Sequence, residues 1–290
     1  MIYYPLYPLC MAHGAVVIEY EEGAKTMHKK QFAALMLAAV LLLAGCSFGG
    51  SSGSTAVKID RPAVESAELQ FTHPAAGDTV AVFDTSAGVF KAVLFPQQAP
   101  QAYDNFVGLV QQGWYNGLTV TRVEKDFVVG AGQGADGKGT TIWKDGARYP
   151  VEATDQLHHY SGALCMGTDG SGDCASVFYV VQTLPGDQSV TQELVDGMNA
   201  AGYRPEVVSA YQTAGGAPYL DYTDTVLGQV YEGMEVVDAM GQTPVDESQC
   251  PTQTITINSV TIETYQQQKK DAGRRPFSYI SPGCSRRHAR

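Results

Sequence analysis

The stretch "TVTRVEKDFVVGAGQG", residues 119–134, decides how the fold is read. It holds two short runs rich in β-forming residues, and a cluster of glycines follows them. One cation, Arg122, lies inside the first run. Three interpretations are open for it: an ion pair on the surface, the approach to a phosphate-binding loop, or a catalytic donor on the wall of a binding groove.

The glycine cluster tests the second interpretation. Gly132, Gly134 and Gly137 match the pattern G-x-G-x-x-G of dinucleotide-binding proteins, which requires a helix N-terminus directly behind it. The residues that follow, "KGTTIWKDGARYP" (138–150), form helices poorly, and Gly139 stands where a P-loop needs Ser or Thr. We therefore expect these glycines to serve tight turns or close backbone contacts.

The flanking sequence predicts a protein made mainly of β-strands. Residues 79–95 indicate a hairpin, and further strand patterns recur at "YSGALCM", "SVFYVV", "TVLGQV" and "TITINSVTIET". Two helices are predicted, one from Pro100 to Gly113 and one in "EGMEVVDAM" (232–240). Residues 184–218 interrupt the strands as a helix-prone insertion. This pattern favours a closed or nearly closed antiparallel barrel.

Charge and leader composition indicate where the protein works. The chain has 290 residues and a formal net charge of -11, which argues against a nucleic-acid partner. The basic tail, residues 266–290, has no periodicity, and we expect it to be disordered. From Met27, two lysines precede a short apolar run and then Ala44, Gly45 and Cys46, as in a secretory signal peptide over 27–45.

The end of this signal resembles the bacterial lipobox, in which the cysteine is lipidated and becomes the mature N-terminus. The resemblance makes Cys46 the lipidation site, with residues 1–26 as an upstream extension and residues 46–78 as a Gly/Ser-rich tether. We therefore expect an extracytoplasmic domain, lipid-anchored to a bacterial cell membrane.

The sequence offers few other candidates for catalytic, metal-binding or disulfide-forming residues. Cys165, Cys174 and Cys250 permit at most one bridge among themselves, and the pairing is open. His158 and His159 are adjacent, so on a strand they would point to opposite faces and make a poor metal pair. No nucleophile motif is present. We expect no metal and no cofactor, and any catalysis must break no covalent bond.

Three segments resemble the cyclophilins, a family of peptidyl-prolyl cis-trans isomerases: "NFVGLVQQGWYNGLTVTRVEKDFVVGAG", "GALCMGTDGSGDCASVFYVV" and "YLDYTDTVLGQVYEGMEVVDAM". The resemblance runs from about Val80 to Ile262. It implies an eight-stranded antiparallel β-barrel capped by two α-helices over residues 79–265, with the insertion at 184–218. It also implies a monomer that accelerates X-Pro rotation in unfolded or exported polypeptides.

By this resemblance, Arg122 is the catalytic donor. The X-Pro bond rotates slowly because resonance stiffens it, with a barrier of ~18–20 kcal/mol. A donor aimed at the prolyl nitrogen holds its lone pair out of conjugation, and arginine remains charged and pre-organised. The resemblance places the proline ring in an apolar pocket of Phe127, Val128, Tyr179 and Leu220, and the substrate backbone beside Gly167, Thr168 and Asp169.

The chain departs from the family pattern at several groove positions. Gly130 and Val177 occupy positions where the family usually has glutamines. Thr168 replaces an asparagine, and Tyr179 replaces a phenylalanine. Tyr219 replaces the tryptophan associated with cyclosporin binding, and Asp224 replaces a histidine of the pocket rim. The loss of polar contacts around the arginine predicts weaker activity than typical members and poor cyclosporin sensitivity. A catalytically weak chaperone that binds proline-containing peptides on the same fold is the alternative.

Overall fold

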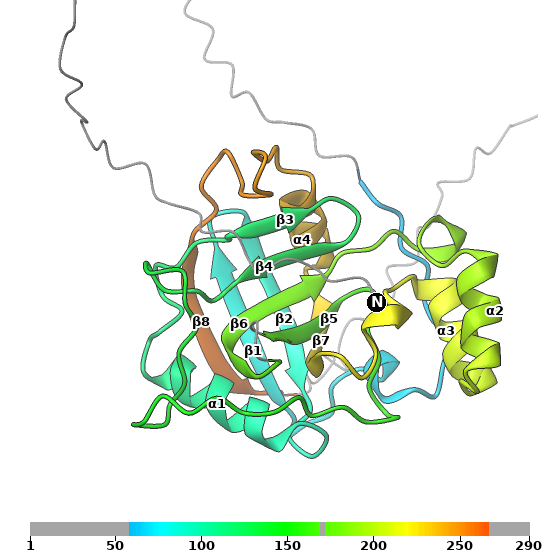
Figure 1. The fold of residues 1–290 in the computed structure, drawn as a ribbon, viewed down its shortest axis with the longest axis horizontal. Helices are drawn as coiled ribbons and strands as arrows, with labels where there is room; N and C mark the ends of the chain where they lie inside the picture. The colour runs from blue at the N-terminus through cyan, green and yellow to red at the C-terminus, as the bar shows by residue number, and fades with distance from the viewer. Residues whose placement is uncertain (1–57, 169–171, 267–290) are drawn as a thin grey trace, which may run out of the picture.

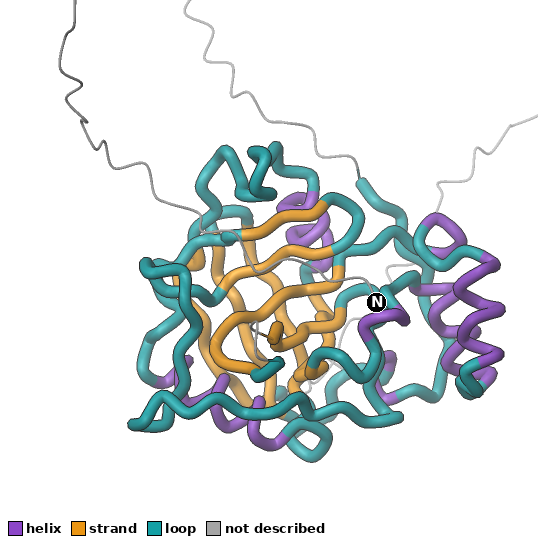
Figure 2. The backbone as a smooth tube through the Cα atoms, in the orientation of Figure 1, coloured by secondary structure: helices purple, strands orange, loops and turns teal. Residues whose placement is uncertain are grey.

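The computed structural model describes residues 58–168 and 172–266, which form one curled antiparallel sheet with helices around it (Figure 1). The strands are β1 (Thr79–Thr85), β2 (Gly88–Leu94), β3 (Arg122–Glu124), β4 (Val128–Ala131), β5 (Ala163–Thr168), β6 (Cys174–Val181), β7 (Thr225–Glu232) and β8 (Ile257–Thr264). Their order across the sheet is β3-β4-β6-β5-β7-β2-β1-β8. Figure 2 shows how far the sheet curls.

The two edge strands, β3 and β8, approach one another through the residues beside them. Thr119 forms an isolated antiparallel bridge with Thr256. The Val120 amide donates to the Ile255 carbonyl oxygen at 2.9 Å. These contacts partly cover the exposed edges, which would otherwise present unpaired backbone groups. The prediction of a mainly β fold with eight antiparallel strands is confirmed as a curled half-barrel.

The inner face of the sheet holds the main core. Phe83 and Phe90, opposite one another on β1 and β2, stack at 4.5 Å, and Phe83 also packs 5.5 Å from Phe178 of β6. Helix α1 (Pro100–Gln111) adds the fully buried Phe106. Alternation of side chains along each strand sends these rings inward and leaves their neighbours for the opposite face.

Both predicted helices are present, as α1 and α4 (Met234–Gly241). Pro100 lies in the first turn of α1, where its missing amide costs nothing. The buried face of α1 is rotated slightly from the predicted one: Phe106 and Val110 are buried as expected, whereas Tyr103 and Val107 are only partly buried.

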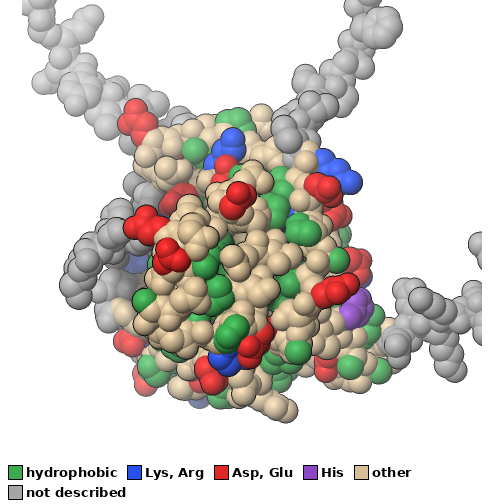
Figure 3. Space-filling model, turned by 90° about the vertical axis from the view of Figure 1, so that its right-hand side faces the viewer, with side chains coloured by type: hydrophobic (Ala, Val, Ile, Leu, Met, Phe, Trp, Pro, Cys, Tyr) green, Lys and Arg blue, Asp and Glu red, His purple; other side chains and the backbone are tan. Residues whose placement is uncertain are grey.

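The insertion forms helices α2 (Gln192–Ala200) and α3 (Pro205–Ala214), and it has its own small core. Residues 58–78, the described part of the predicted tether, pack between the insertion and the barrel. Glu68 accepts two hydrogen bonds from Arg204, at 2.8 and 2.9 Å, and the Phe71 ring lies 4.8 Å from Tyr160. Figure 3 shows this side of the molecule, where acidic side chains are scattered among apolar ones.

The remaining elements are short 3-10 helices: η1 (Leu69–Phe71), η2 (Gly186–Gln188) and η3 (Pro218–Leu220).

Cys165 and Cys174 are both free thiols, so no bridge joins them. Within residues 58–168 and 172–266, no helix has the length and apolarity that a membrane crossing requires. The predicted signal peptide, Cys46 and nearly all of the basic tail lie outside the described residues.

Candidate active site

The outer face of the sheet carries the predicted site residues in a row. Arg122 on β3 is opposite Gly130 on β4, Gly130 is opposite Tyr179 on β6, and Tyr179 is opposite Cys165 on β5. Residues directly opposite one another share a face, and neighbouring strands lie about 4.8 Å apart. The row therefore places the arginine and the tyrosine on one surface, two strand spacings apart.

An apolar cluster surrounds this row. Val128 and Tyr179 are buried in it, and Phe127 and Leu220 pack against it partly exposed. Tyr219 is 48% exposed, and its ring lies 6.1 Å from that of Phe127. The predicted lining residues thus lie together on the face that bears Arg122, with apolar surface open to a ligand.

Arg122 is held by a neighbour on its own strand. Its Nε donates to Glu124 Oε1 at 2.7 Å, and its Nη2 contacts the same oxygen. The two side chains are on the same face because they are two residues apart on a strand. They are 15% and 27% exposed. Arg122 therefore forms the ion pair of the first interpretation, and this pair lies at the edge of the apolar surface.

The two expected glutamine positions leave this wall without amide side chains. A Cβ added at Gly130 would meet Arg122 Cβ and the Phe178 carbonyl oxygen at 3.5 Å, and Tyr179 Cβ at 3.7 Å. These are ordinary contact distances, so a side chain there is compatible with the backbone. Val177 lies on β6, two residues before Tyr179 and on the same face, and it is buried.

A carboxylate lies beside Tyr179 on this apolar surface. Asp224 Oδ2 accepts from the Tyr179 hydroxyl at 2.7 Å, and its Oδ1 accepts from Thr168 Oγ1 at 3.2 Å. Both donors are neutral. The hydroxyl that distinguishes Tyr179 from phenylalanine thus has a specific partner. Gly167 is buried at the end of β5, and Asp169 lies outside the described residues.

The glycine cluster has the structural role predicted for it. A Cβ at Gly132 would lie 2.3 Å from the Ser176 carbonyl oxygen, so only glycine permits that approach of the two strands. The Gly137 amide closes a turn by donating to the Gly134 carbonyl oxygen at 2.9 Å. No helix follows within residues 138–168. Among the described residues, no group of three or more His, Cys, Asp or Glu side chains is arranged to hold a metal ion.

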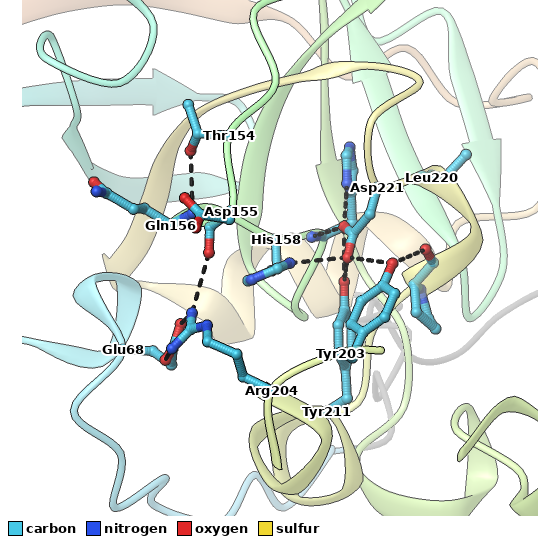
Figure 4. A network of polar contacts seen from close by, with 12 residues as sticks. Glu68, Thr154, Asp155, Gln156, His158, Tyr203, Arg204, Tyr211, Leu220 and Asp221 are labelled. Carbon is cyan, nitrogen blue, oxygen red and sulfur yellow. Dashed lines mark hydrogen bonds and ion pairs between the residues drawn. The ribbon is translucent and has the colours of Figure 1, made fainter. Parts of the chain in front are cut away.

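One polar cluster has no counterpart among the features predicted from the sequence. His158 and His159 are not on a strand, and they do not point apart: the Nδ1 atoms of both lie 2.9 Å from the Asp221 carboxylate (Figure 4). The expectation of opposite faces was wrong because it assumed an extended pleat. The only sequence signal was the pair of adjacent histidines, which does not reveal a partner 62 residues away.

The chain is thus a mainly β protein with Arg122 and an apolar cluster on the outer face of a curled sheet. A family model described as cyclophilin type peptidyl-prolyl cis-trans isomerase/CLD matches residues 80–262. The chain belongs to this family of isomerases.

Relatives agree with this assignment. A protein of Staphylococcus saprophyticus provisionally named a peptidyl-prolyl cis-trans isomerase is 33% identical over 184 residues, covering 62% of this chain and 90% of the relative. A Staphylococcus aureus protein with the same name is 31% identical over 190 residues, covering 64% and 93%. The crystal structure of a Cryptosporidium parvum cyclophilin type isomerase has a TM-score of 0.51 at 20% identity, covering 65% of this chain and 99% of that one.

Proposed function

We propose that this chain accelerates X-Pro rotation by donating a hydrogen bond from Arg122 to the prolyl nitrogen, with the proline ring on the apolar surface beside Tyr179. The observation that carries the proposal is the row of Arg122, Gly130 and Tyr179 across β3, β4 and β6. It sets a permanent cation at the edge of a pocket lined by Phe127, Val128 and Leu220.

The chemistry asks little more of the protein. Rotation breaks no covalent bond, and the transition state differs from the ground state by the freed lone pair on nitrogen. Each ~1.4 kcal/mol removed from the barrier raises the rate tenfold. A donor that binds this lone pair stabilises the transition state selectively, whereas the apolar pocket binds the proline in both states.

Unfolded, exported polypeptides are the substrates that we propose, with the domain acting as a monomer. We infer the exported location of these substrates from the signal-like sequence that ends at Cys46. A crystal structure of the Cryptosporidium parvum isomerase obtained in the presence of the dipeptide Ala-Pro has a TM-score of 0.50 to this chain, which supports proline-containing ligands here. Nucleic acid does not suit a chain with net charge -11.

A refolding assay tests this function. A protein whose slow folding phase is limited by X-Pro isomerisation should refold faster with catalytic amounts of this chain. An unchanged slow phase, together with measurable binding of a prolyl peptide, would instead support the chaperone alternative. The observation that favours this alternative is the lack of an amide side chain at Gly130 and Val177.

Substrate preference should depend on Asp224. Its carboxylate is half-buried beside Tyr179, accepts hydrogen bonds from the neutral hydroxyls of Thr168 and Tyr179, and forms no ion pair among the described residues. An exposed ion pair is worth about 0.2–1 kcal/mol, so peptides with Lys or Arg beside proline should be favoured up to about fivefold over those with Glu. Asp224→Asn should remove this preference, as should high salt. Equal kcat/KM for Lys and Glu peptides in the wild type would contradict the proposal.

Anchoring should depend on Cys46. We expect the full-length chain in a bacterial host to fractionate with the membrane and to incorporate a labelled fatty acid. More than one acyl chain on the lipidated cysteine would give stable membrane anchoring. Cys46→Ser should abolish the labelling and release the folded domain to the soluble fraction. Labelling that persists in the Cys46→Ser chain would rule out this cysteine as the site.

A further inference from the structure

The insertion is joined to the barrel by the Asp221 cluster, four buried side chains and the partly buried Tyr203. The buried members are Asp221, His158, His159 and Tyr211, and Figure 4 labels every member of the cluster except His159. The Asp221 side chain is only 2% exposed. Its two oxygens accept from both histidine Nδ1 atoms and from the Tyr211 hydroxyl at 2.9 Å, and from the Tyr203 hydroxyl at 3.1 Å. The His159 backbone amide adds a further donor at 2.9 Å.

The cluster is built to hold an ionised carboxylate. Burial by itself raises the pKa of Asp221, but the hydrogen bonds and charges of His158 and His159 outweigh it and hold this pKa below its usual value. Burial raises the pKa of both Tyr203 and Tyr211, so their hydroxyls keep the proton that they donate. A buried carboxylate is tolerated only with its full set of donors, so each donor constrains the position of Asp221.

The cluster meets the proline groove at two places. Asp221 directly follows Leu220, and the Tyr203 hydroxyl also contacts the Pro218 carbonyl oxygen at 3.3 Å, so the turn that carries Leu220 is fixed at both ends. The His159 ring is nearly parallel to the Tyr179 ring, with centroids 6.5 Å apart, and Tyr179 belongs to the apolar surface beside Arg122. One carboxylate thus supports both the turn that carries Leu220 and, through His159, the ring of Tyr179.

Half of the side-chain donors come from the insertion. Tyr211 is on α3 and Tyr203 lies in the turn between α2 and α3, whereas His158 and His159 belong to the barrel side. We infer that the insertion is a positioning element for the groove: through Asp221 it holds Leu220 and Tyr179 in the arrangement that binds the proline ring. This inference rests on the proposed function of the groove. It makes Asp221, Tyr203 and Tyr211 positioning residues for substrate affinity.

Tyr211→Phe tests this inference, and Tyr160→Phe is its matched control. The two tyrosines are both fully buried, with ring centroids 4.5 Å apart. The Tyr160 hydroxyl has no hydrogen-bond partner among the described residues, whereas the Tyr211 hydroxyl donates to Asp221. Each change therefore removes one hydroxyl from the same aromatic core, and only one of them removes a donor from the carboxylate.

The measurements are the Kd of a prolyl peptide, the KM and kcat of its isomerisation, and the Tm of each full-length variant. We expect Tyr211→Phe to raise Kd and KM about fivefold with kcat nearly unchanged, and Tyr160→Phe to change them less than twofold. Should Tyr211→Phe fail to fold, Tyr203→Phe, which removes the weaker and more exposed donor, takes its place with the same expected direction.

Equal Kd values for Tyr211→Phe and Tyr160→Phe would overturn the inference, as would a fall in kcat without a change in KM. A loss of Tm alone, with wild-type Kd in the folded variant, would also overturn it, because the cluster would then be only structural. Failure of the proposed function is distinguishable: a wild type that binds the peptide without turnover still gives a Kd on which the positioning role is decided.

Discussion

Arg122→Ala is expected to lower kcat/KM for X-Pro isomerisation about 100-fold, while the Kd of the peptide changes less than about threefold. Removal of one donor aimed at developing charge in a transition state typically costs about 10²–10³ in rate. The apolar groove around Tyr179 and Leu220 remains, so ground-state binding survives. An interaction made only in the transition state affects kcat, not affinity.

Glu124→Gln is the control for this variant. It keeps the guanidinium but weakens the ion pair that Arg122 forms in the free protein. We expect activity within about threefold of wild type, since rim ion pairs contribute little. If Arg122→Ala kept the wild-type rate, or if Glu124→Gln lost as much as Arg122→Ala, then the ion pair and not donation to the substrate would be the role of Arg122.

Gly130→Gln is expected to raise kcat/KM about tenfold. Gly130 lies between Arg122 and Tyr179 on the groove face, and an added Cβ meets nothing closer than 3.5 Å. The φ angle of Gly130 is not positive, so a side chain adds no backbone strain there. A glutamine amide at this place can orient the guanidinium and the substrate backbone, and better positioning of a catalytic group raises rate. Kinetics on a prolyl peptide measure the effect.

Gly130→Ala separates the amide from the Cβ. It adds the same first carbon without a polar group, so it should leave kcat/KM within about twofold of wild type. An equal gain from alanine would show that backbone stiffening, and not the amide, improves the site. A loss of activity in Gly130→Gln, with Tm unchanged, would mean that the longer side chain fills the groove and that the glycine serves substrate access.

Most of the fold could be predicted from local sequence patterns. Runs of β-forming residues predict the strands, as in "SVFYVV", where every residue is buried, and apolar residues at helical spacing predict α1. The site residues came from the resemblance, and β-pairing brings Arg122, Gly130 and Tyr179 into one row. The turn role of Gly137 was predictable because it depends on local backbone geometry; Gly132 also has a positive φ, but its close approach to Ser176 involves a distant strand.

Contacts between distant segments could not be predicted in the same way. The convergence of His158 and His159 on Asp221 depends on a non-strand backbone and on a turn about 60 residues later. The packing of residues 58–78 against the insertion depends on pairs such as Glu68 with Arg204, 136 residues apart. No periodicity encodes such partners, because either side chain alone is compatible with solvent exposure.

NMR exchange spectroscopy on one prolyl peptide tests the central claim most directly, because it separates binding from rotation in the same sample. Free X-Pro bonds exchange in ~10–100 s, so catalysed exchange is visible against no background. Wild-type protein should give cis–trans exchange peaks together with binding shifts, and Arg122→Ala should keep the shifts and lose the exchange. Binding shifts without exchange in the wild type would contradict the account and identify a proline-binding protein on an isomerase fold.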